Sequence, residues 1–183
     1  DFDLLIANPP YIRTQVLGSD QARLLSKNFG LKGRVDLYQA FLVAMKVVLK
    51  PNAVAGVIVS NRFLTTKGAG KFREILYNQY SIKGIWDFGD TRVFEAAVLP
   101  AVIIMSPRQK NHNNKNIPFT SIYLAEKSNS GKTIPYVENQ IVALHYSGIV
   151  SNSKEFYSVK HGYLNYDSNP SGLWRLQDSE SKN

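Results

Sequence analysis

Residues 4–12, LLIANPPYI, constrain the fold more than any other segment of this sequence. The apolar run at residues 3–7 predicts a buried strand, because it is too apolar for the edge of a sheet. Two consecutive prolines fix φ and cannot continue a strand, so we expect the strand to end before Asn8. Ligands of open α/β sheets bind beyond the carboxyl ends of the strands, which makes this corner the first candidate site.

The chemistry of the corner suits a planar ring that carries an exocyclic amine. The Asn8 side chain and the Pro9 carbonyl offer two hydrogen-bond acceptors, and Tyr11 adds a flat aromatic ring. If both amine protons are accepted, the nitrogen is pulled toward tetrahedral geometry and its lone pair is freed to attack. A base inside a duplex has to rotate out of the stack to reach such a pocket. The alternative is a Pro-Pro turn closed by a surface tyrosine.

The rest of the first 106 residues alternates between helical and strand patterns. We expect helices at residues 19–28, 36–50 and 68–80, and further strands at residues 56–60, 82–88 and 98–106. This alternation predicts an α/β fold with a parallel sheet and helices on its faces. The last strand follows its predecessor without a helix, so we expect that pair to be antiparallel.

Two of these helices have a predicted buried face. Pro51 is expected to end the helix at residues 36–50, whose apolar stripe contains Leu37, Phe41, Ala44, Met45 and Val48. The helix at residues 68–80 is expected to turn Phe72, Ile75 and Leu76 inward.

The sequence changes character after Pro107. Residues 108–116 are polar and predict an exposed loop, and residues 117–124 predict a strand that pairs back as a hairpin. Residues 126–183 are rich in Ser, Asn, Gly and Tyr, and predict a helix-poor extension. We therefore expect one unit at residues 1–125 and an extension at residues 126–183.

The chain is basic, and its charge is uneven. The formal net charge is +8, with 15 Lys and Arg against 8 Asp and Glu in residues 1–110, hence +7, and 7 against 6 in residues 111–183, hence +1. The first part favours a polyanionic partner, and a basic surface that only keeps the chain soluble explains the charge equally well. The chain has no cysteine, which excludes disulfides and thiolate metal sites. No apolar run reaches the ~18 residues of a membrane helix.

The segment FDLLIANPPY, residues 2–11, resembles the catalytic motif of the adenine-specific DNA methyltransferases, which transfer methyl from S-adenosylmethionine. Residues 36–76 resemble the helix, strand and helix that follow this motif, and residues 82–105 resemble the next strand, an acidic and aromatic loop and an antiparallel hairpin. The similarity is greatest to the group that includes fused type IIG restriction–modification enzymes. It implies the C-terminal half of a Rossmann-like methyltransferase sheet that acts on double-stranded DNA in a prokaryotic cytoplasm.

The resemblance also implies roles for single residues. Asn8 and Pro9 would hold and polarise the target amine, and Pro10 belongs to the same catalytic motif. Tyr11 would stack on the extruded adenine, and Phe94 would pack on its other side.

The cofactor site implied by the resemblance is incomplete in this sequence. Asp36 and Tyr38 lie where family members approach the catalytic loop and cofactor, and a helix cap with a first-turn aromatic explains them equally well. The family's glycine-rich turn and cofactor-binding acidic residue precede the NPPY strand, so we expect the main S-adenosylmethionine site upstream of Asp1 and an inactive 183-residue piece. The open sheet is expected to self-associate.

Other polar residues are weaker candidates. A basic group that can meet DNA phosphates, or simply form a solvated helix face, consists of Arg62, Lys67, Lys71 and Arg73. Asn61, Arg62 and Phe63 end the predicted strand at residues 56–60 and either line the cofactor or DNA side or form a turn. The three histidines, His112, His145 and His161, lack metal-ligand spacing, so we expect no metal site.

Two alternatives to a DNA-adenine methyltransferase stay open. The first is a basic module that binds nucleic acid without chemistry, supported by the charge of residues 1–110. The second is a methyltransferase with the same corner that acts on RNA or on protein glutamine. At the far end, Trp174 resembles the anchor of a link to a target-recognition domain, so the DNA sequence recognised is not readable from this chain.

Overall fold

The computed structural model describes residues 1–12, 16, 18–32, 35–94, 98–109, 114–127, 133–166 and 168–178. Within these residues one mixed sheet runs through the molecule in the order β1-β2-β4-β3-β5-β7-β6, with β8 paired to β7. Its strands are β1 (Phe2–Ala7), β2 (Leu49–Ser60), β3 (Tyr80–Asp87), β4 (Pro100–Pro107), β5 (Pro118–Ala125), β6 (Gly148–Ser151), β7 (Phe156–Asn165) and β8 (Arg175–Asp178). The predicted α/β class is confirmed.

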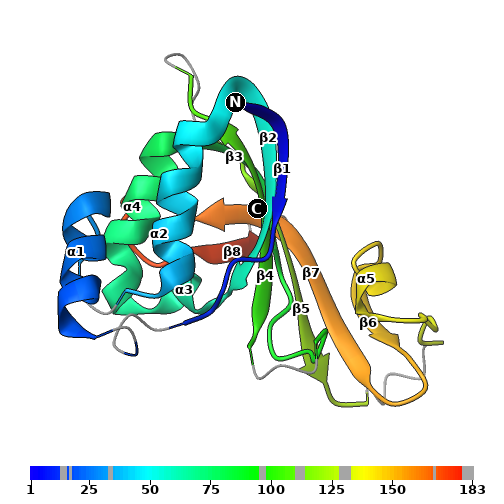
Figure 1. Cartoon of the computed structure of the whole chain (residues 1–183). Helices are drawn as coiled ribbons and strands as arrows, with labels where there is room; N and C mark the ends of the chain where they lie inside the picture. Colours follow the sequence, from blue (N-terminus) through cyan, green and yellow to red (C-terminus); the bar gives the residue numbers. More distant parts are fainter. Residues whose placement is uncertain are drawn as a thin grey trace.

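Helices cover the sheet unequally. Figure 1 shows α1, α2, α3 and α4 against one face of the sheet and α5 beside β6 and β7 on the other. The helices are α1 (Ser19–Phe29), α2 (Leu37–Ala44), α3 (Arg62–Thr65), α4 (Gly70–Gln79) and α5 (Gln140–Ala143), with 3-10 turns at Met45–Val48 and Lys67–Ala69. None of the helices in the described ranges is long and apolar enough to cross a membrane.

The strand directions bring four strand ends to one edge. β1 is parallel to β2, β3 is parallel to β5, and β4 is antiparallel to both β2 and β3. The carboxyl ends of β1, β2, β3 and β5 therefore share one side of the sheet, which we call the carboxyl edge. The antiparallel pairing of β3 with β4 confirms the prediction for the strand at residues 98–106.

The predicted hairpin after residue 116 is wrong. β5 does not pair back onto β4; it pairs in parallel with β3, with Trp86 opposite Thr120. β4 already has β2 and β3 on its two sides, so no edge of β4 is left for another strand. A parallel partner on the free side of β3 is the remaining way to extend the sheet.

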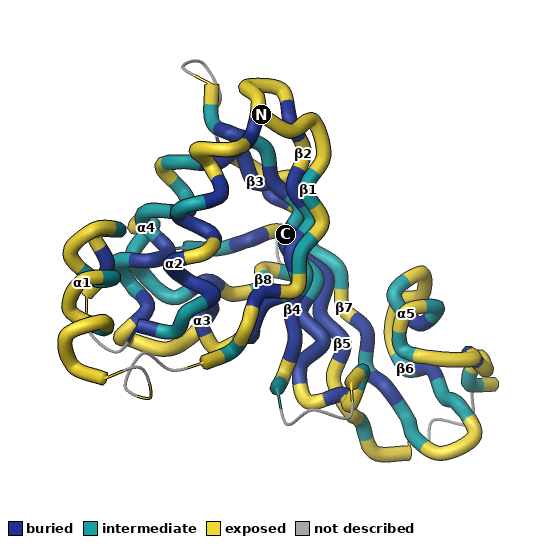
Figure 2. The backbone as a smooth tube through the Cα atoms, in the orientation of Figure 1, coloured by how far each residue is buried: buried dark blue, intermediate teal, exposed yellow. Residues whose placement is uncertain are grey.

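The prediction that residues 3–7 form a buried strand is also wrong within the described chain, because β1 is an edge strand. Leu5 and Ala7 pack on the helix-covered core, whereas Leu4 is 61% and Ile6 is 81% exposed on the opposite face (Figure 2). The strand is apolar throughout because both of its faces carry apolar side chains. The helices of the described chain cover only the face with Leu5 and Ala7.

The helix predicted at residues 36–50 is shorter than expected. α2 ends at Ala44, and β2 starts at Leu49 and continues through Pro51. The pairing of β1 with β2 is irregular between Phe2 and Leu4, beside this part of β2, where a proline is tolerated.

The predicted stripe of this helix is wrong for Phe41 and Val48, which are 36% and 40% exposed, whereas Met45 is buried as predicted. α2 contacts both α1 and α4 and therefore buries a wider face, consisting of Tyr38, Gln39, Ala40, Leu42 and Val43. In α4 the prediction holds for Phe72 and Leu76, which are buried.

Residues after 125 add strands to the same sheet. β7 pairs with β5 over its length, and β6 and β8 pair with β7. Trp174, expected to anchor a link, is 1% exposed and packs edge-on against Phe63 with ring centroids 5.9 Å apart. The division at residue 125 stays a prediction, and the sheet runs across it.

Candidate active site

The NPPY segment forms a corner at the carboxyl edge. Ala7 lies opposite Val57 on β2, and the chain then turns so that Pro9 is buried and Asn8 is exposed. The Tyr11 hydroxyl lies 2.8 Å from Asn8 Oδ1 and 3.1 Å from the Ile58 carbonyl, and its single proton is shared between these two acceptors. The corner is thus held to β2 by the side chain of its own tyrosine.

A second tie joins the corner to α2. The Leu37 N–H donates to the Ile12 carbonyl at 2.8 Å, so the start of α2 is fixed beside Tyr11. Tyr38 lies below Tyr11 with ring centroids 6.1 Å apart and planes at 49°. Burial raises the pKa of both phenols above the ordinary value, which keeps them neutral at physiological pH.

Tyr11 borders a cavity of about 360 Å³ at the carboxyl edge. Its lining residues come from the corner, the starts of α2 and α3, the end of β2 and the chain before β4, and are Tyr11, Asp36, Tyr38, Ser60, Arg62, Val98 and Leu99. The lining combines aromatic and apolar surface with a carboxylate and a guanidinium. Such a cavity has the size and mixed character of a small-molecule or nucleobase site.

Asp36 serves two purposes in this arrangement. It is the N-cap residue of α2, and its backbone N–H donates to Gln39 Oε1 at 3.4 Å. It also lines the cavity beside Tyr11 and Tyr38. The two explanations that the sequence left open, a helix cap and a site residue, are compatible in the structure.

Phe94 lies on the connection from β3 to β4 and is 44% exposed. It does not line the cavity, whereas Val98 and Leu99 of the same connection do. The intervening residues 95–97 of the VFEAAV loop lie outside the described residues. The role of Phe94 therefore stays a prediction.

The four basic residues do not form one group. Arg62 lines the cavity, Lys67 is exposed, and Lys71 pairs with Glu74 at 3.0 Å.

The inclusion of Arg73 among the DNA-contacting residues is wrong. Arg73 is 1% exposed, and its guanidinium donates to the carbonyls of Phe63, Thr66 and Ser171 at 2.6, 2.8 and 2.9 Å. These bonds join α3, α4 and the turn before β8, so the charge is directed into the protein and not toward a phosphate.

Several residues of this region were not predicted from the sequence. Ser60 and Leu99 line the cavity, and the only signal for them is that each adjoins the end of a strand at the carboxyl edge. Asp87, at the end of β3, was missed too, although it binds the Asn61 side chain. Phe63, considered with Asn61 and Arg62, is fully buried and belongs to the core.

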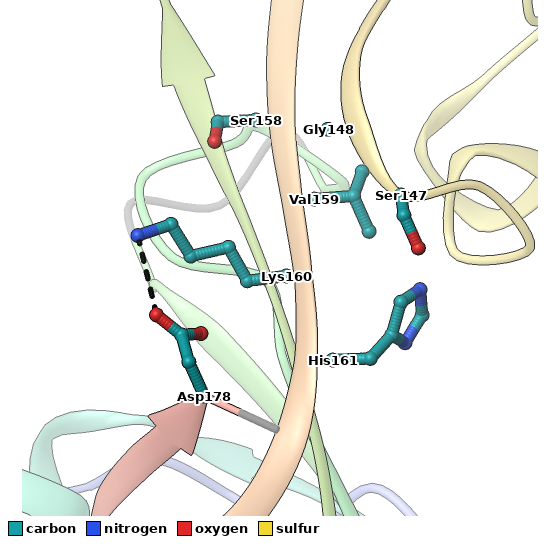
Figure 3. Close-up of a pocket in the computed structure, with 7 residues that line it drawn as sticks. All are labelled: Ser147, Gly148, Ser158, Val159, Lys160, His161 and Asp178. Atoms are coloured by element: carbon teal, nitrogen blue, oxygen red, sulfur yellow. Dashed lines mark ion pairs between the residues drawn. The ribbon is translucent and has the colours of Figure 1, made fainter. Parts of the chain in front are cut away.

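A second cavity, of about 340 Å³, lies on β7 and shares no residue with the first (Figure 3). In it Lys160 Nζ lies 3.9 Å from Asp178 Oδ2. The ring nitrogens of His161 contact Thr120 Oγ1 at 3.0 Å and the Tyr146 carbonyl at 2.7 Å. These side chains hold strands and turns together.

Among the described residues no three His, Asp or Glu side chains gather as metal ligands, and His112 lies outside them.

Comparison with known proteins gives the family. The model of the Eco57I restriction-modification methylase family matches residues 1–94, about half of the chain. The chain is 38% identical over 185 residues to the type II methyltransferase M.BanIII of Aneurinibacillus aneurinilyticus, covering 99% of this chain and 32% of that protein. It is 31% identical over 114 residues to the type II methyltransferase M.XhoI of Xanthomonas vasicola, covering 60% of this chain and 21% of that protein.

Solved structures agree on the fold. A proposed class I S-adenosylmethionine-dependent methyltransferase from Listeria monocytogenes matches 65% of this chain and 36% of its own, at a TM-score of 0.52 and 16% identity. The modification subunit of a proposed type I restriction enzyme from Vibrio vulnificus matches 99% of this chain and 38% of its own, at a TM-score of 0.51 and 13% identity.

The matches above cover only part of each relative. The chain spans about a third of the length of M.BanIII and about a fifth of that of M.XhoI. The matched residues 1–94 include the corner at Asn8 and Tyr11, the cavity residue Arg62 and the end of β3. The chain therefore belongs to the Eco57I restriction-modification methylase family.

Proposed function

We propose that this chain forms the target-base half of a DNA methyltransferase that modifies the exocyclic amine of adenine. The observation that carries the proposal is the pairing of Asn8 Oδ1 with the Tyr11 hydroxyl, 2.8 Å apart, beside a cavity at the carboxyl edge. This hydrogen bond holds the amide acceptor of Asn8 next to the aromatic ring of Tyr11 at the end of β1. Membership of the methylase family supports methyl transfer as the reaction.

The residues of the corner act on the amine. Asn8 Oδ1 and the Pro9 carbonyl accept hydrogen bonds from its two N–H groups, which concentrates electron density on the nitrogen. The Tyr11 ring stacks on the extruded base and holds it in place. Positioning and acceptor contacts supply the rate enhancement, without a covalent intermediate on the protein.

S-adenosylmethionine, when bound, supplies an electrophilic methyl group on a sulfonium ion. Asp36 and Tyr38 line the cavity next to Tyr11, and a carboxylate beside an aromatic ring suits a cationic group. These residues fit one part of a cofactor site. Their contribution would be to orient the cation.

The deciding experiment is Asn8→Ala in the full-length protein that contains these 183 residues. Asn8 is exposed, so we expect its melting temperature and its affinity for DNA to be unchanged. Methyl transfer to adenine, measured by mass spectrometry of digested DNA, should fall by about 100-fold or more. Asn78→Ala, at an exposed position of α4, is the matched control and should keep full activity. Wild-type methylation by Asn8→Ala would remove the basis of the proposal.

Assays of the same full-length protein on different substrates distinguish this proposal from the two alternative functions. A nucleic-acid-binding module predicts salt-sensitive DNA binding with no methylated product, independent of Asn8 and Tyr11. A methyltransferase for RNA or protein glutamine predicts product on those substrates only. We expect methylated adenine on duplex DNA and none on matched RNA or glutamine peptides.

A further inference from the structure

Asp87, the last residue of β3, carries a carboxylate that is almost fully enclosed. The residue is 5% exposed. Oδ1 accepts hydrogen bonds from Asn61 Nδ2, at 2.8 Å, and from the Gly89 N–H, at 2.9 Å. Oδ2 accepts from the Tyr123 hydroxyl at 2.8 Å. We call Asp87, Asn61, Gly89 and Tyr123 the Asp87 hub.

The hub joins three separate segments at the carboxyl edge. Asn61 follows the end of β2, Gly89 begins the connection from β3 to β4, and Tyr123 lies on β5. Asn61 Nδ2 also contacts the Gly89 carbonyl at 3.3 Å. One carboxylate therefore fixes how far apart the ends of three strands lie.

A buried carboxylate is a costly way to join strands. The donors that the structure shows on Asp87 are neutral, so no ion pair with them offsets the loss of hydration. Apolar side chains would hold three strands together at a lower cost. What a carboxylate adds is direction, since three short hydrogen bonds to one group define the geometry of all three donors.

The geometry that the hub defines reaches the cavity. The Asn61 backbone N–H donates to the Leu99 carbonyl at 2.8 Å, and Leu99 lines the cavity. Arg62 follows Asn61 directly and lines the cavity as well. Asn61 is thus held by Asp87 through its side chain and holds one cavity wall through its backbone.

The loop that starts at Gly89 is held just as closely. Gly89 has φ +53°, and a Cβ there would lie 2.5 Å from the Ile122 carbonyl, so a glycine is needed. Next along the chain, the Asp90 carboxylate accepts the Leu124 N–H at 2.8 Å. The loop thereby docks on β5 before it continues to Phe94 and Leu99.

We propose that Asp87 is a positioning residue for the extruded base, acting through Asn61 on the cavity wall at Leu99 and Arg62. This inference rests on the proposed function. It assigns no contact with substrate to Asp87. Its contribution is to keep the wall in the conformation that receives the base, so its loss should affect turnover more than DNA affinity.

The test compares Asp87→Ala, Asp87→Asn and Asn61→Ala in the full-length protein. Alanine at position 87 removes all three hydrogen bonds. Asparagine can keep them, because its Oδ1 accepts from Asn61 and Gly89 while its Nδ2 donates to a reoriented Tyr123 hydroxyl. We expect Asp87→Ala to lower kcat by about 100-fold, Asn61→Ala by about tenfold and Asp87→Asn by less than about fivefold. The Kd for DNA should change by less than about twofold, because none of these residues is assigned to phosphate binding.

A spectroscopic readout separates positioning from general destabilisation. With 2-aminopurine at the target position, extrusion of the base raises its fluorescence in the wild-type complex. We expect that rise to shrink in Asp87→Ala and Asn61→Ala and to return in Asp87→Asn. Melting temperatures identify variants that do not fold, and Asn61→Ala decides the outcome if Asp87→Ala is unfolded.

Tyr123→Phe removes only the bond from β5, and Tyr163→Phe on β7 is its control at the same 43% exposure. We expect Tyr123→Phe to lower kcat by about threefold and Tyr163→Phe to leave it unchanged. A folded Asn61→Ala with wild-type kcat and fluorescence, or equal losses in the two tyrosine variants, would overturn the inference. If Asn8→Ala abolishes methylation while the hub variants behave as wild type, only the inference fails. If Asn8→Ala is fully active, the proposed function itself fails.

Discussion

Tyr11 donates its hydroxyl proton to Asn8 Oδ1 across 2.8 Å, so the proposed acceptor for the target amine already has a partner in the protein alone. An amide oxygen has two lone pairs and can accept a second hydrogen bond without losing the first. The same hydroxyl also contacts the Ile58 carbonyl at 3.1 Å, which fixes the ring relative to β2. The corner is therefore pre-organised by the residue that we propose to stack on the base.

The ring of Tyr11 and its hydroxyl have different proposed roles, which two substitutions can distinguish. Tyr11→Phe keeps the stacking surface and removes both hydrogen bonds, so we expect methyl transfer within about tenfold of wild type. Tyr11→Ala removes the ring and should cost about 10- to 100-fold, as for other base-stacking residues. Single-turnover methylation assays measure both effects. Equal losses for the two variants would show that the hydroxyl, and not the ring, carries the function.

Arg62 and Lys67 are exposed, and the proposed function places DNA near them. Each phosphate contact contributes about 0.9 to the slope of log Kobs against log salt concentration. We expect Arg62→Ala and Lys67→Ala each to lower the magnitude of that slope by about 0.9, as measured by fluorescence anisotropy over a salt series. Lys154→Ala is the control, because Lys154 is exposed between β6 and β7, away from the carboxyl edge, and should leave the slope unchanged. An unchanged slope in all three variants would exclude these side chains from the DNA interface.

Arg73 should instead matter for stability. Its side chain satisfies three carbonyl groups, two of them from the segment at Phe63 and Thr66, and Arg73→Met leaves these acceptors without the donor. We expect the free energy of unfolding to fall by about 3 kcal/mol or more, since hydrogen bonds to a charged group are lost at several sites. Lys67→Met, at an exposed position, should stay within about 0.5 kcal/mol of wild type. Urea unfolding compares the two, and a neutral Arg73→Met would contradict the structural role.

The uncovered face of β1 predicts association of the isolated 183-residue chain. Leu4 and Ile6 are exposed on an edge strand. Val54 of β2, which lies opposite Leu4, is 41% exposed and extends this apolar surface. We expect Ile6→Lys to raise the monomer fraction measured by sedimentation velocity, because a charge on this face opposes pairing. Val47→Lys is the control, since Val47 is 83% exposed, close to the 81% of Ile6, but lies in the turn between α2 and β2. A monomeric wild-type chain would refute the expectation.

Local sequence patterns were sufficient for the elements that depend on local chemistry. The helix at residues 19–28 forms as α1 and ends at Gly30, which has φ +65° as a C-terminal cap requires. The strands around residues 82–88 and 98–106 and their antiparallel pairing follow from short apolar runs without a helix between them. The corner at Asn8 follows from two prolines that no strand can accommodate.

Long-range pairing decided the rest. The partner of β5 depends on which strand edges β2 and β3 leave open, and the exposure of Leu4 depends on what covers the second face of the sheet. The residues of β5 alone do not determine its partner strand, and the residues of β1 alone do not determine how exposed Leu4 is. The same holds for two charged side chains: Arg73 resembled a surface cation, and Asp87 resembled an ordinary strand-end residue.

The sequence by itself determined the α/β class, the strand that ends at Asn8 and the chemistry available at that corner, because these depend on backbone restrictions and side-chain type. Only the tertiary structure decided that Arg73 is enclosed by carbonyls and that Asp87 joins Asn61 to Tyr123. The physical reason is that these side chains depend on partners 26, 36 and 98 residues away in the chain, whose meeting is set by the sheet order.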